Sequence, residues 1–497
     1  MNNCLISGCL MSHGFLILAS VLISACTVGP DYRRPPATAP AAFKELNGWK
    51  QAQPRDNEIP GRWWEIFKDP YLNTLEEQVD IANQSLAQAE AQYRQAQALV
   101  QTARAAYFPT AAATATVNRF RAASGQNVAV SGVRYLFGVA LSAAWEPDLW
   151  GGVRRQVESS EASAQASAAT LQALRLSTQA ALAQNYFQLR ALDAQKKLLN
   201  DTVGTYERTL KITQNRYAAG MAAKTDVVQA ETQLQSAQAQ AIDIGVQRAQ
   251  FEHAIALLMG KAPAELSITV SALDALPPLI PVSIPSELLE RRPDVAAAER
   301  QTAAANAQIG VAKAAYFPTL SLAATNGFQT SKLSKLLTAA ARYWALGPAA
   351  AAFTLFDGGA RGAQMDEAIH AYDASVAAYR QAVLTSFQEV EDNLAALRIL
   401  EQEMEVQNKA VASARETVRL TLNQYKAGTV SYLNVMTAQA VAFTNEKLAV
   451  ELLGQRLNAA VLLVKAVGGG WHASALPTQD EAGGETKWSQ FLPIPVK

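Results

Sequence analysis

Few residues in this 497-residue chain have the type and spacing that chemistry requires. General bases and metal ligands are most often histidines, and the chain has four: His13, His253, His370 and His472. They lie far apart, and all three cysteines precede residue 27, which argues against a transition-metal site. No G-x-S-x-G motif or P-loop is present, and the carboxylates of "EPD" (146–148) and "RRPD" (291–294) fall in expected turns. Such carboxylates ordinarily cap helices or form ion pairs, so we expect no enzyme, no metal and no dissociable cofactor.

One cysteine lies in a context that favours covalent modification. The apolar run "FLILASVLISAC" (15–26) ends in small residues and Cys26 and is too short for a spanning helix, so it predicts a secretory signal. Its end, "LISAC", resembles a lipoprotein box, in which cleavage before Cys26 leaves that residue as the acylated N-terminus. The alternative is a plain signal peptide with a chance cysteine. Residue 27 is Thr rather than Asp, which by analogy with enteric bacteria favours sorting to the outer membrane.

Composition excludes several classes of protein. The 43 basic residues balance the 43 acidic ones, so a nucleic-acid partner or a polybasic membrane patch is not expected. Because no cysteine follows Cys26, a disulfide framework is also excluded for the chain after that residue. No later segment reaches about 18 apolar residues, so any membrane crossing must come from strands.

The chain contains two copies of one unit. The segment "ARAAYFPTAAATA" (103–115) returns as "AKAAYFPTLSLAA" (312–324), and "RYAAGMAAKTDVVQAE" (216–231) returns as "QYKAGTVSYLNVMTAQ" (424–439). The offset stays near 208 residues, whereas solenoid repeats have periods of about 20 to 50 residues. The pattern therefore indicates duplication of a larger module.

Each copy predicts the same order of elements. A helix of about 26 residues ends at Pro109 or Pro318, and roughly 40 residues with strand character follow. A helix of about 67 residues then reaches Gly220 or Gly428, and a helix of about 40 residues follows each glycine. Because the two shorter lengths add up to the longer one, two short helices stacked end to end are expected to run beside one long helix, on a path of about 100 Å.

The helix after each glycine has a heptad seam. In the first copy the seam runs from Val227 to Leu258 with alternating spacings of three and four, and most of its residues are small, which permits close helix axes. An arginine falls at the same seam position in both copies, Arg248 and Arg456. Two interpretations remain open: a stem lying over the seam with the guanidinium in water, or a specific pairing with a carboxylate.

Two strands per copy give about four per chain. A sheet in lipid must close, because unpaired backbone groups there are costly, and bacterial barrels have at least about eight strands. If the strands cross a membrane, several chains must share one barrel; soluble hairpins are the alternative. The secretion signal and the predicted acyl anchor favour the membrane.

Residues 291–322, "RRPDVAAAERQTAAANAQIGVAKAAYFPTLSL", resemble the signature of the TolC-like outer-membrane efflux proteins. The lipoprotein box and the two glycine turns are similar to the NodT-type lipoprotein branch of that family. The resemblance covers nearly the whole chain after the signal. It implies a mainly α fold with a membrane β-barrel: a homotrimer whose 12-stranded β-barrel continues into a long periplasmic α-helical barrel.

The resemblance divides the chain into six parts. These are a signal peptide (1–25), an N-terminal periplasmic segment (26–80), the first repeat (81–270), a linker (271–291), the second repeat (292–470) and a C-terminal periplasmic tail (471–497).

In this family the two glycine turns lie at the periplasmic end and meet the adaptor, which implies adaptor contacts at Gly220, Met221, Gly428 and Thr429. The closed state is held by a tyrosine three residues before the second glycine and an aspartate six after the first. These positions are Tyr425 and Asp226.

An arginine that makes a further tie in the family is replaced here by Val430. Many members line the constriction with aspartates, which correspond to Asn434 and Thr437. The resemblance thus implies an aperture lined by neutral residues.

The implied function is an outer-membrane channel for tripartite efflux in a Gram-negative bacterium. It is a passive duct for drugs or other small molecules, docked to a periplasmic adaptor and an inner-membrane pump such as an RND transporter. It is lipid-anchored in the outer membrane and extends into the periplasm. The alternatives are the exit duct of a type I protein secretion system and, in another class, a non-conducting coiled-coil lipoprotein.

Overall fold

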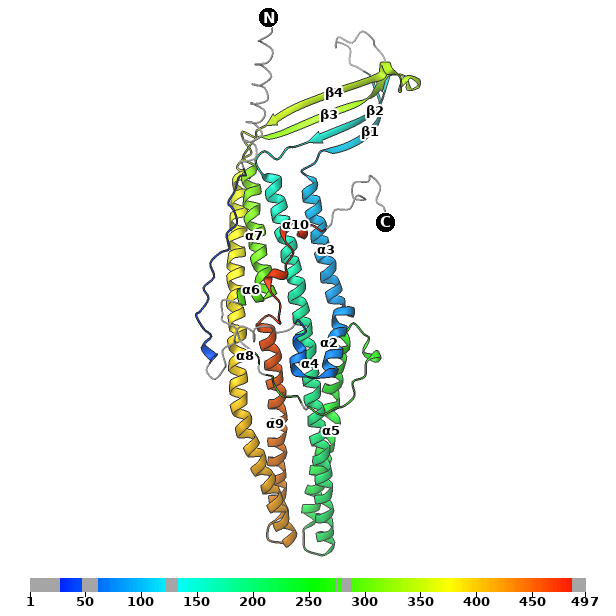
Figure 1. The fold of residues 1–497 in the computed structure, drawn as a ribbon. Helices are drawn as coiled ribbons and strands as arrows, with labels where there is room; N and C mark the ends of the chain where they lie inside the picture. Colours follow the sequence, from blue (N-terminus) through cyan, green and yellow to red (C-terminus); the bar gives the residue numbers. More distant parts are fainter. Residues whose placement is uncertain are drawn as a thin grey trace.

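The computed structural model describes residues 27–46, 61–121, 133–273, 275–278, 280 and 288–484; the predicted modification site Cys26 lies outside them. Long helices run side by side, a four-stranded sheet projects from one end, and two helical hairpins end at the other (Figure 1). The mainly α fold with one sheet confirms the predicted class. Among the described residues, no helix is both long and apolar enough to cross a membrane.

The two copies of the repeat contain the same elements in the same order, as predicted. The first consists of α3 (Gln84–Ala105), β1 (Thr110–Arg121), β2 (Val133–Trp145), α4 (Gly152–Ala218) and α5 (Lys224–Leu258). The second consists of α7 (Pro293–Ala314), β3 (Thr319–Thr330), β4 (Arg342–Ala352), α8 (Ala360–Ala427) and α9 (Tyr432–Ala466). Shorter pieces are η1 (Lys44–Leu46), η2 (Trp63–Phe67), α2 (Pro70–Ala82), η3 (Pro263–Glu265), α6 (Leu288–Arg291), η5 (Leu333–Lys335), η6 (Ala339–Ala341), η7 (Ala473–Ala475) and α10 (Gln479–Ala482).

The long helices have the predicted length and the short ones do not. α4 and α8 have 67 and 68 residues, whereas α3 and α7 have 22 each and α5 and α9 have 35 each. The sequence predicts helices that run up to Pro109 and Pro318, whereas α3 ends at Ala105 and α7 at Ala314. Asn83 accepts a hydrogen bond from the Leu86 backbone N–H at 3.0 Å, which caps α3 and separates it from α2.

The short helices stack end to end, as predicted, through the same junction in both copies. The Asn83 amide donates to the carbonyl of Leu258 at the end of α5 (2.7 Å), and Arg292 donates to the carbonyl of Ala466 at the end of α9 (3.2 Å). Gly260 lies against the Ala82 carbonyl so closely that a Cβ would come within 2.1 Å of its oxygen. The corresponding Gly468 lies equally close to the Arg291 carbonyl, at 2.0 Å. Both glycines also have positive φ, so glycine is required at each junction.

The two copies join laterally along α4. α3 and α5 pack along α4, α7 and α9 pack along α8, and α4 also contacts α7 and α9. The order is therefore α3, α4, α7, α8 near the sheet and α5, α4, α9, α8 near the hairpin tips (Figure 1). α3 and α5 form one edge of this wall, and α8 forms the other.

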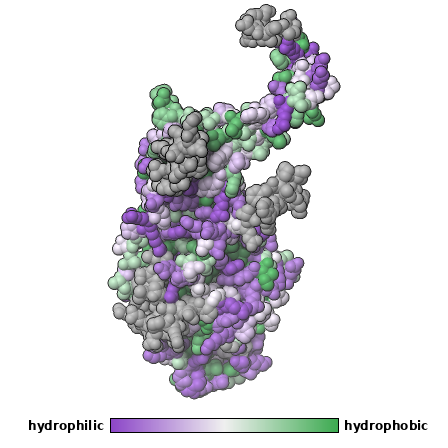
Figure 2. Space-filling model, turned by 45° about the horizontal axis from the view of Figure 1, so that its top comes forward, coloured by the Kyte–Doolittle hydropathy of each residue, from purple (hydrophilic) through white to green (hydrophobic). Residues whose placement is uncertain are grey.

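The sheet has the order β1-β2-β3-β4 and is antiparallel throughout. β1 and β2 form the hairpin of the first copy, β3 and β4 that of the second, and β2 pairs with β3 in a register that sets Val139 opposite Phe328. The sheet extends beyond the helices as an arm (Figures 1 and 2). Within the described chain, β1 and β4 each have one unpaired edge.

The predicted turn carboxylates have the expected structural roles. Asp148 accepts hydrogen bonds from the backbone N–H groups of Val153 (3.0 Å) and Arg154 (2.9 Å), which caps the first turn of α4. Asp294 forms an ion pair with Arg292 at 2.6 Å. Burial opposes ionisation of Asp294, but the hydrogen bonds and charge of Arg292 outweigh it and lower the pKa of that carboxyl.

The main core lies halfway along the helices, where η2 and α2 pack on α4. Trp63, Leu72, Tyr186 and Phe187 are almost fully buried there. Glu76 of α2 is also fully buried, and neither of its carboxyl oxygens has a hydrogen-bond partner among the described residues. Burial, with the nearby charge of Asp80, raises the pKa of Glu76 well above its ordinary value, so folding favours the neutral form of this carboxyl.

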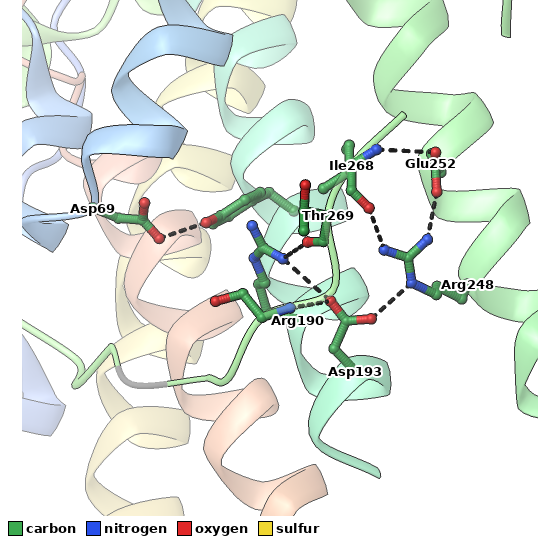
Figure 3. A network of polar contacts seen from close by, with 9 residues as sticks. Asp69, Arg190, Asp193, Arg248, Glu252, Ile268 and Thr269 are labelled. Carbon is green, nitrogen blue, oxygen red and sulfur yellow. Dashed lines mark hydrogen bonds and ion pairs between the residues drawn. The ribbon is translucent and has the colours of Figure 1, made fainter. Parts of the chain in front are cut away.

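A buried ionic network joins α4, α5 and the segment after α5 (Figure 3). Arg248 donates to Asp193 at 2.7 Å, to Glu252 at 2.5 Å and to the carbonyl of Ile268 at 2.6 Å. Arg190 donates to the same Asp193 at 3.2 Å and to the carbonyl of Thr269 at 2.7 Å. Of the two interpretations of Arg248, pairing with a carboxylate is therefore confirmed.

The second copy repeats the pair in a weaker form. Arg456 pairs with Glu401 at 3.3 Å, but the Glu401 side chain is 67% exposed, whereas the Asp193 side chain is fully buried. Buried charges depend on their partners far more than exposed ones do.

The pair offers a matched test of burial. Asp193→Ala leaves the buried Arg190 without its carboxylate and Arg248 with Glu252 alone, so we expect it to destabilise the chain by about 3 to 5 kcal/mol. Glu401→Ala at the corresponding exposed position is expected to cost less than about 1 kcal/mol. Denaturant unfolding followed by circular dichroism measures both; equal shifts in the two variants would contradict a special role for the buried network.

Candidate functional site

The sheet has one apolar face and one polar face. Alternate residues of a strand point to opposite faces, and the register links these faces across all four strands. The apolar face carries Val117, Val133, Tyr135, Phe137, Val139, Leu141, Leu322, Phe328, Trp344 and Leu346, with Asn326, Thr330 and, at its far end, Arg119, Arg121 and Arg342 as polar exceptions. The other face carries Thr110, Thr114, Thr116, Asn118, Ser142, Ser321, Thr325 and Gln329, with Phe120 and Leu136 as apolar exceptions.

The apolar face is not covered by the rest of the chain. Leu141 is 65% exposed, Trp344 73% and Leu346 84%. A water-soluble surface rarely exposes a contiguous apolar area of this kind. One face suited to lipid and one suited to water are the pattern of a sheet that separates a membrane from an aqueous lumen.

The two helical hairpins end in the same turn. Gly220 and Gly428 have φ of +72° and +81°, in the left-handed region that favours glycine. After them, the backbone N–H of Met221 bonds to the carbonyl of Arg216 (2.8 Å), and that of Thr429 bonds to the carbonyl of Gln424 (3.0 Å). The predicted tip residues are thus at the tips, and Met221 is 63% exposed there.

Arg216 of α4 ties the first hairpin to the second. Its Nη1 donates to the carbonyls of Tyr425 (2.6 Å) and Lys426 (3.2 Å), in the last turn of α8. Its guanidinium carbon also lies 4.8 Å from the centroid of the Tyr425 ring. A cation on the terminal carbonyls of a helix interacts favourably with the helix dipole, so this contact fixes the relative positions of the two tips.

Arg216 has no counterpart in the second copy, where the same position is Gln424. Arg216 was not among the predicted site residues, which were those that the two glycine turns share or that match the family's pattern. The feature of the sequence that could have revealed Arg216 is the difference between the two copies at this position.

The tyrosine of the predicted lock is buried between the hairpins. Tyr425 packs with Tyr432, Val435 and Ala230, and Val430 packs partly buried against the same cluster. Thus Val430, in place of the family's arginine, adds an apolar contact.

The Tyr425 hydroxyl donates to Thr213 Oγ1 at 3.3 Å, and no bond to Asp226 is formed among the described residues. Asp226 lies near Tyr432 instead. Burial raises the pKa of Tyr432, and smaller contributions in the same direction come from Tyr206, Tyr425 and Asp226. The hydrogen bond of Tyr425 in this chain therefore differs from the expected one, because its hydroxyl is directed at α4. A closed-state role for Tyr425 and Asp226 stays a prediction.

The two predicted aperture residues share an exposed face of α9. Asn434 and Thr437 are exposed, whereas Tyr432, Val435 and Ala438 are buried on the opposite face. The Thr437 hydroxyl donates to the carbonyl of Leu433 at 2.9 Å. Among the described residues, no cluster of His, Cys, Asp or Glu could hold a metal ion.

These features define a class of protein. The helical wall has paired tips at one end, and the sheet at the other end has one face suited to lipid and one suited to water. Such an arrangement is that of a channel-forming envelope protein. The chain matches the family described as "Outer membrane efflux protein" over residues 76–261 and 284–469. The two matched segments correspond to the two copies of the repeat.

Similar proteins of known role match over almost their whole length. The toluene efflux pump outer membrane protein TtgF of Pseudomonas putida is 30% identical over 473 residues, which cover 93% of this chain and 97% of TtgF. The pyoverdine export outer membrane protein OpmQ of Pseudomonas aeruginosa is 30% identical over 474 residues, covering 93% and 98%. In structure, the outer-membrane channel OprN aligns with a TM-score of 0.84 at 31% identity, covering 90% of this chain and 100% of that one.

The chain therefore belongs to the outer membrane efflux protein family, which confirms the predicted TolC-like resemblance. It is an outer-membrane channel of an efflux system, and not an enzyme.

The tie between the tips predicts a change in conductance. Arg216→Ala removes a charged donor from two carbonyls, a loss of about 1.5 to 3 kcal/mol, and weakens the contact between the first tip and the second. We expect a higher single-channel conductance in planar bilayers. Arg208→Ala is the control, because Arg208 is an exposed arginine of the same helix whose hydrogen bond, among the described residues, goes to Thr205 of α4. An unchanged conductance in Arg216→Ala would show that the tie does not restrict the opening.

Proposed function

We propose that this channel is a homotrimer in which three four-stranded sheets close into one twelve-stranded barrel and the helices continue it as a periplasmic α-barrel. In this arrangement it is a passive exit duct. It carries drugs or other small molecules from an inner-membrane pump, such as an RND transporter, through a periplasmic adaptor and across the outer membrane.

The open edges of the sheet carry this proposal. β1 and β4 each leave one edge unpaired, and a sheet edge in lipid costs several kcal/mol per unsatisfied backbone group. Four strands are too few to close, since bacterial barrels begin at about eight. Three copies of four strands give twelve, with β4 of one chain beside β1 of the next. The helical wall has matching edges, α3 and α5 on one side and α8 on the other.

A lipid on Cys26 fits the position of the residues that follow it. Thr27 packs against Gly151, where a Cβ would come within 2.7 Å of the Thr27 methyl carbon, and the Val28 N–H bonds to the carbonyl of Trp150 (3.1 Å). Both contacts lie between the end of β2 and the start of α4, at the base of the sheet. An acyl chain on the preceding residue would therefore enter the membrane at the level where the sheet begins.

The hairpin tips are the proposed contact for the adaptor. Gly220, Met221, Gly428 and Thr429 lie exposed at the end of the molecule opposite the sheet (Figure 1). Tyr425 and Asp226, just above them, are the proposed closed-state lock, and Asn434 and Thr437 the proposed lining of the aperture.

The cargo is proposed to be small molecules. The names of TtgF and OpmQ assign those proteins to toluene efflux and pyoverdine export, which supports small-molecule efflux here over protein secretion.

A pair of adjacent substitutions tests the barrel. Leu141 is on the apolar face and Ser142 on the polar face. Leu141→Arg sets a charge in lipid at a cost of about 2 to 4 kcal/mol near the midplane, so we expect loss of trimer and of channel activity. Ser142→Arg is expected to retain the trimer, with an altered ion selectivity. Native mass spectrometry and single-channel recording measure both; wild type that neither trimerises nor conducts would refute the proposed function.

The aperture residues predict weak block by trivalent cations. Asn434 and Thr437 present no charge, so a trivalent cation added on the periplasmic side should reduce the current only weakly. Asn434→Asp combined with Thr437→Asp would form a ring of carboxylates in the trimer and should make the block strong. Micromolar block of the wild type, or no gain in the double variant, would count against this assignment of the aperture.

A further inference from the structure

The far end of the sheet carries positive charge without negative charge. Residues 110–145 and 319–352 include all four strands and contain no Asp or Glu. Their basic residues are Arg119, Arg121, Arg134, Lys332, Lys335 and Arg342. All six lie at the strand ends away from the helices or in the turn between β3 and β4 (Figure 1). In Figure 2 the projecting arm is likewise more hydrophilic toward its far end.

Three of these arginines lie on the apolar face. Arg119 and Arg121 follow Val117 in steps of two, and Arg342 is paired with Phe328. Steps of two keep side chains on one face of a strand. All three arginines are exposed, and among the described residues none has an ion-pair partner. Arg134 is on the opposite, polar face.

Aromatic rings adjoin these arginines on the same face. The guanidinium carbon of Arg119 lies 5.5 Å from the centroid of the Tyr135 ring, and Tyr135 stacks on Phe137 at 6.0 Å. Trp344 follows Arg342 by two residues and is 73% exposed. Aromatic side chains mark the boundary between hydrocarbon and headgroups in membrane barrels. Arginines just beyond them, with long flexible stems, reach the depth of the headgroups.

We propose that Arg119, Arg121 and Arg342 bind the phosphate groups of a lipid headgroup in the outer leaflet. The proposal rests on the proposed function, which sets the apolar face of the sheet in the membrane and the hairpin tips in the periplasm. A guanidinium group binds phosphate oxygens through two parallel N–H donors, and this end of the sheet has no carboxylate to compete. Because β1 and β4 are the sheet edges, Arg342 of one chain lies beside Arg119 and Arg121 of the next in the trimer. Each subunit boundary then forms one site.

A lipid fits this site better than a soluble anion does. The three arginines share their face with Val117, Tyr135 and other apolar side chains. An anion passing through the lumen would meet the polar face and its Arg134 instead.

The test is binding of lipid A, a lipid with two phosphomonoesters on its headgroup, to the purified full-length protein in detergent. Native mass spectrometry counts the bound lipids. We expect the variant Arg119→Gln/Arg121→Gln/Arg342→Gln to bind at least about tenfold more weakly than the wild type. The affinity of the wild type for the lipid should fall by a similar factor when the two phosphates are removed from the lipid.

Two controls separate the site from general charge. Arg134→Gln removes the arginine of the polar face, and Arg208→Gln/Arg380→Gln/Arg419→Gln removes three exposed arginines from the helices. Both are expected to bind lipid A within about twofold of the wild type. Equal binding by the first triple variant, an equal loss in the helix triple variant, or binding of inorganic phosphate as tight as that of lipid A would each overturn the proposal.

Single-channel recording on the same preparations distinguishes a failure of the lipid site from a failure of the proposed channel function. If the wild type conducts and the sheet triple variant still binds lipid A normally, the lipid site is refuted and the channel stands. If the wild type does not conduct, the proposed function fails first, and with it the orientation that the lipid site needs.

Discussion

A β-strand within a membrane cannot leave its backbone N–H and C=O groups unpaired, and the rest of this molecule follows from that constraint. The strand order β1-β2-β3-β4 is the lateral order of the helices beside it. α3 leads into β1, β2 into α4, α7 into β3, and β4 into α8. The helical wall thus continues the sheet strand by strand, and a sheet that closes also closes the wall.

The sequence predicted the features that depend on local spacing. The two copies, the proline-terminated helices, the four strands and the glycine turns could all be found, because each is set by residues close together in the chain. The junction between stacked helices was not predicted. It depends on Asn83 and Arg292 reaching carbonyls at the ends of α5 and α9, 175 and 174 residues away in the chain. No periodicity encodes such a contact, and the two residues that make it differ in type.

The same distinction applies to the tips. Gly220 and Gly428 were predicted from their recurrence, and the structure has the same turn at both. The contact of Arg216 with the carbonyl of Tyr425 joins residues on different hairpins, so it became visible only once the hairpins were placed side by side. The two copies thus share the same backbone structure, whereas the side-chain contacts that join them are made by residues that one copy has and the other lacks. Asp193, buried and shared by two arginines, and Glu401, mostly exposed, differ in the same way.

The isolated carboxyl of Glu76 has a consequence for how the chain folds. At neutral pH an unfolded chain leaves this group ionised, since its ordinary pKa is 4.5, whereas the folded core raises the pKa and favours the neutral form. At a pH between the ordinary pKa and the raised pKa of the folded chain, folding therefore takes up a proton at this carboxyl. By linkage, the folded state is favoured most below pH 4.5 and loses part of this contribution as the pH rises toward the folded pKa. The folded chain would thus gain stability as the medium becomes mildly acidic.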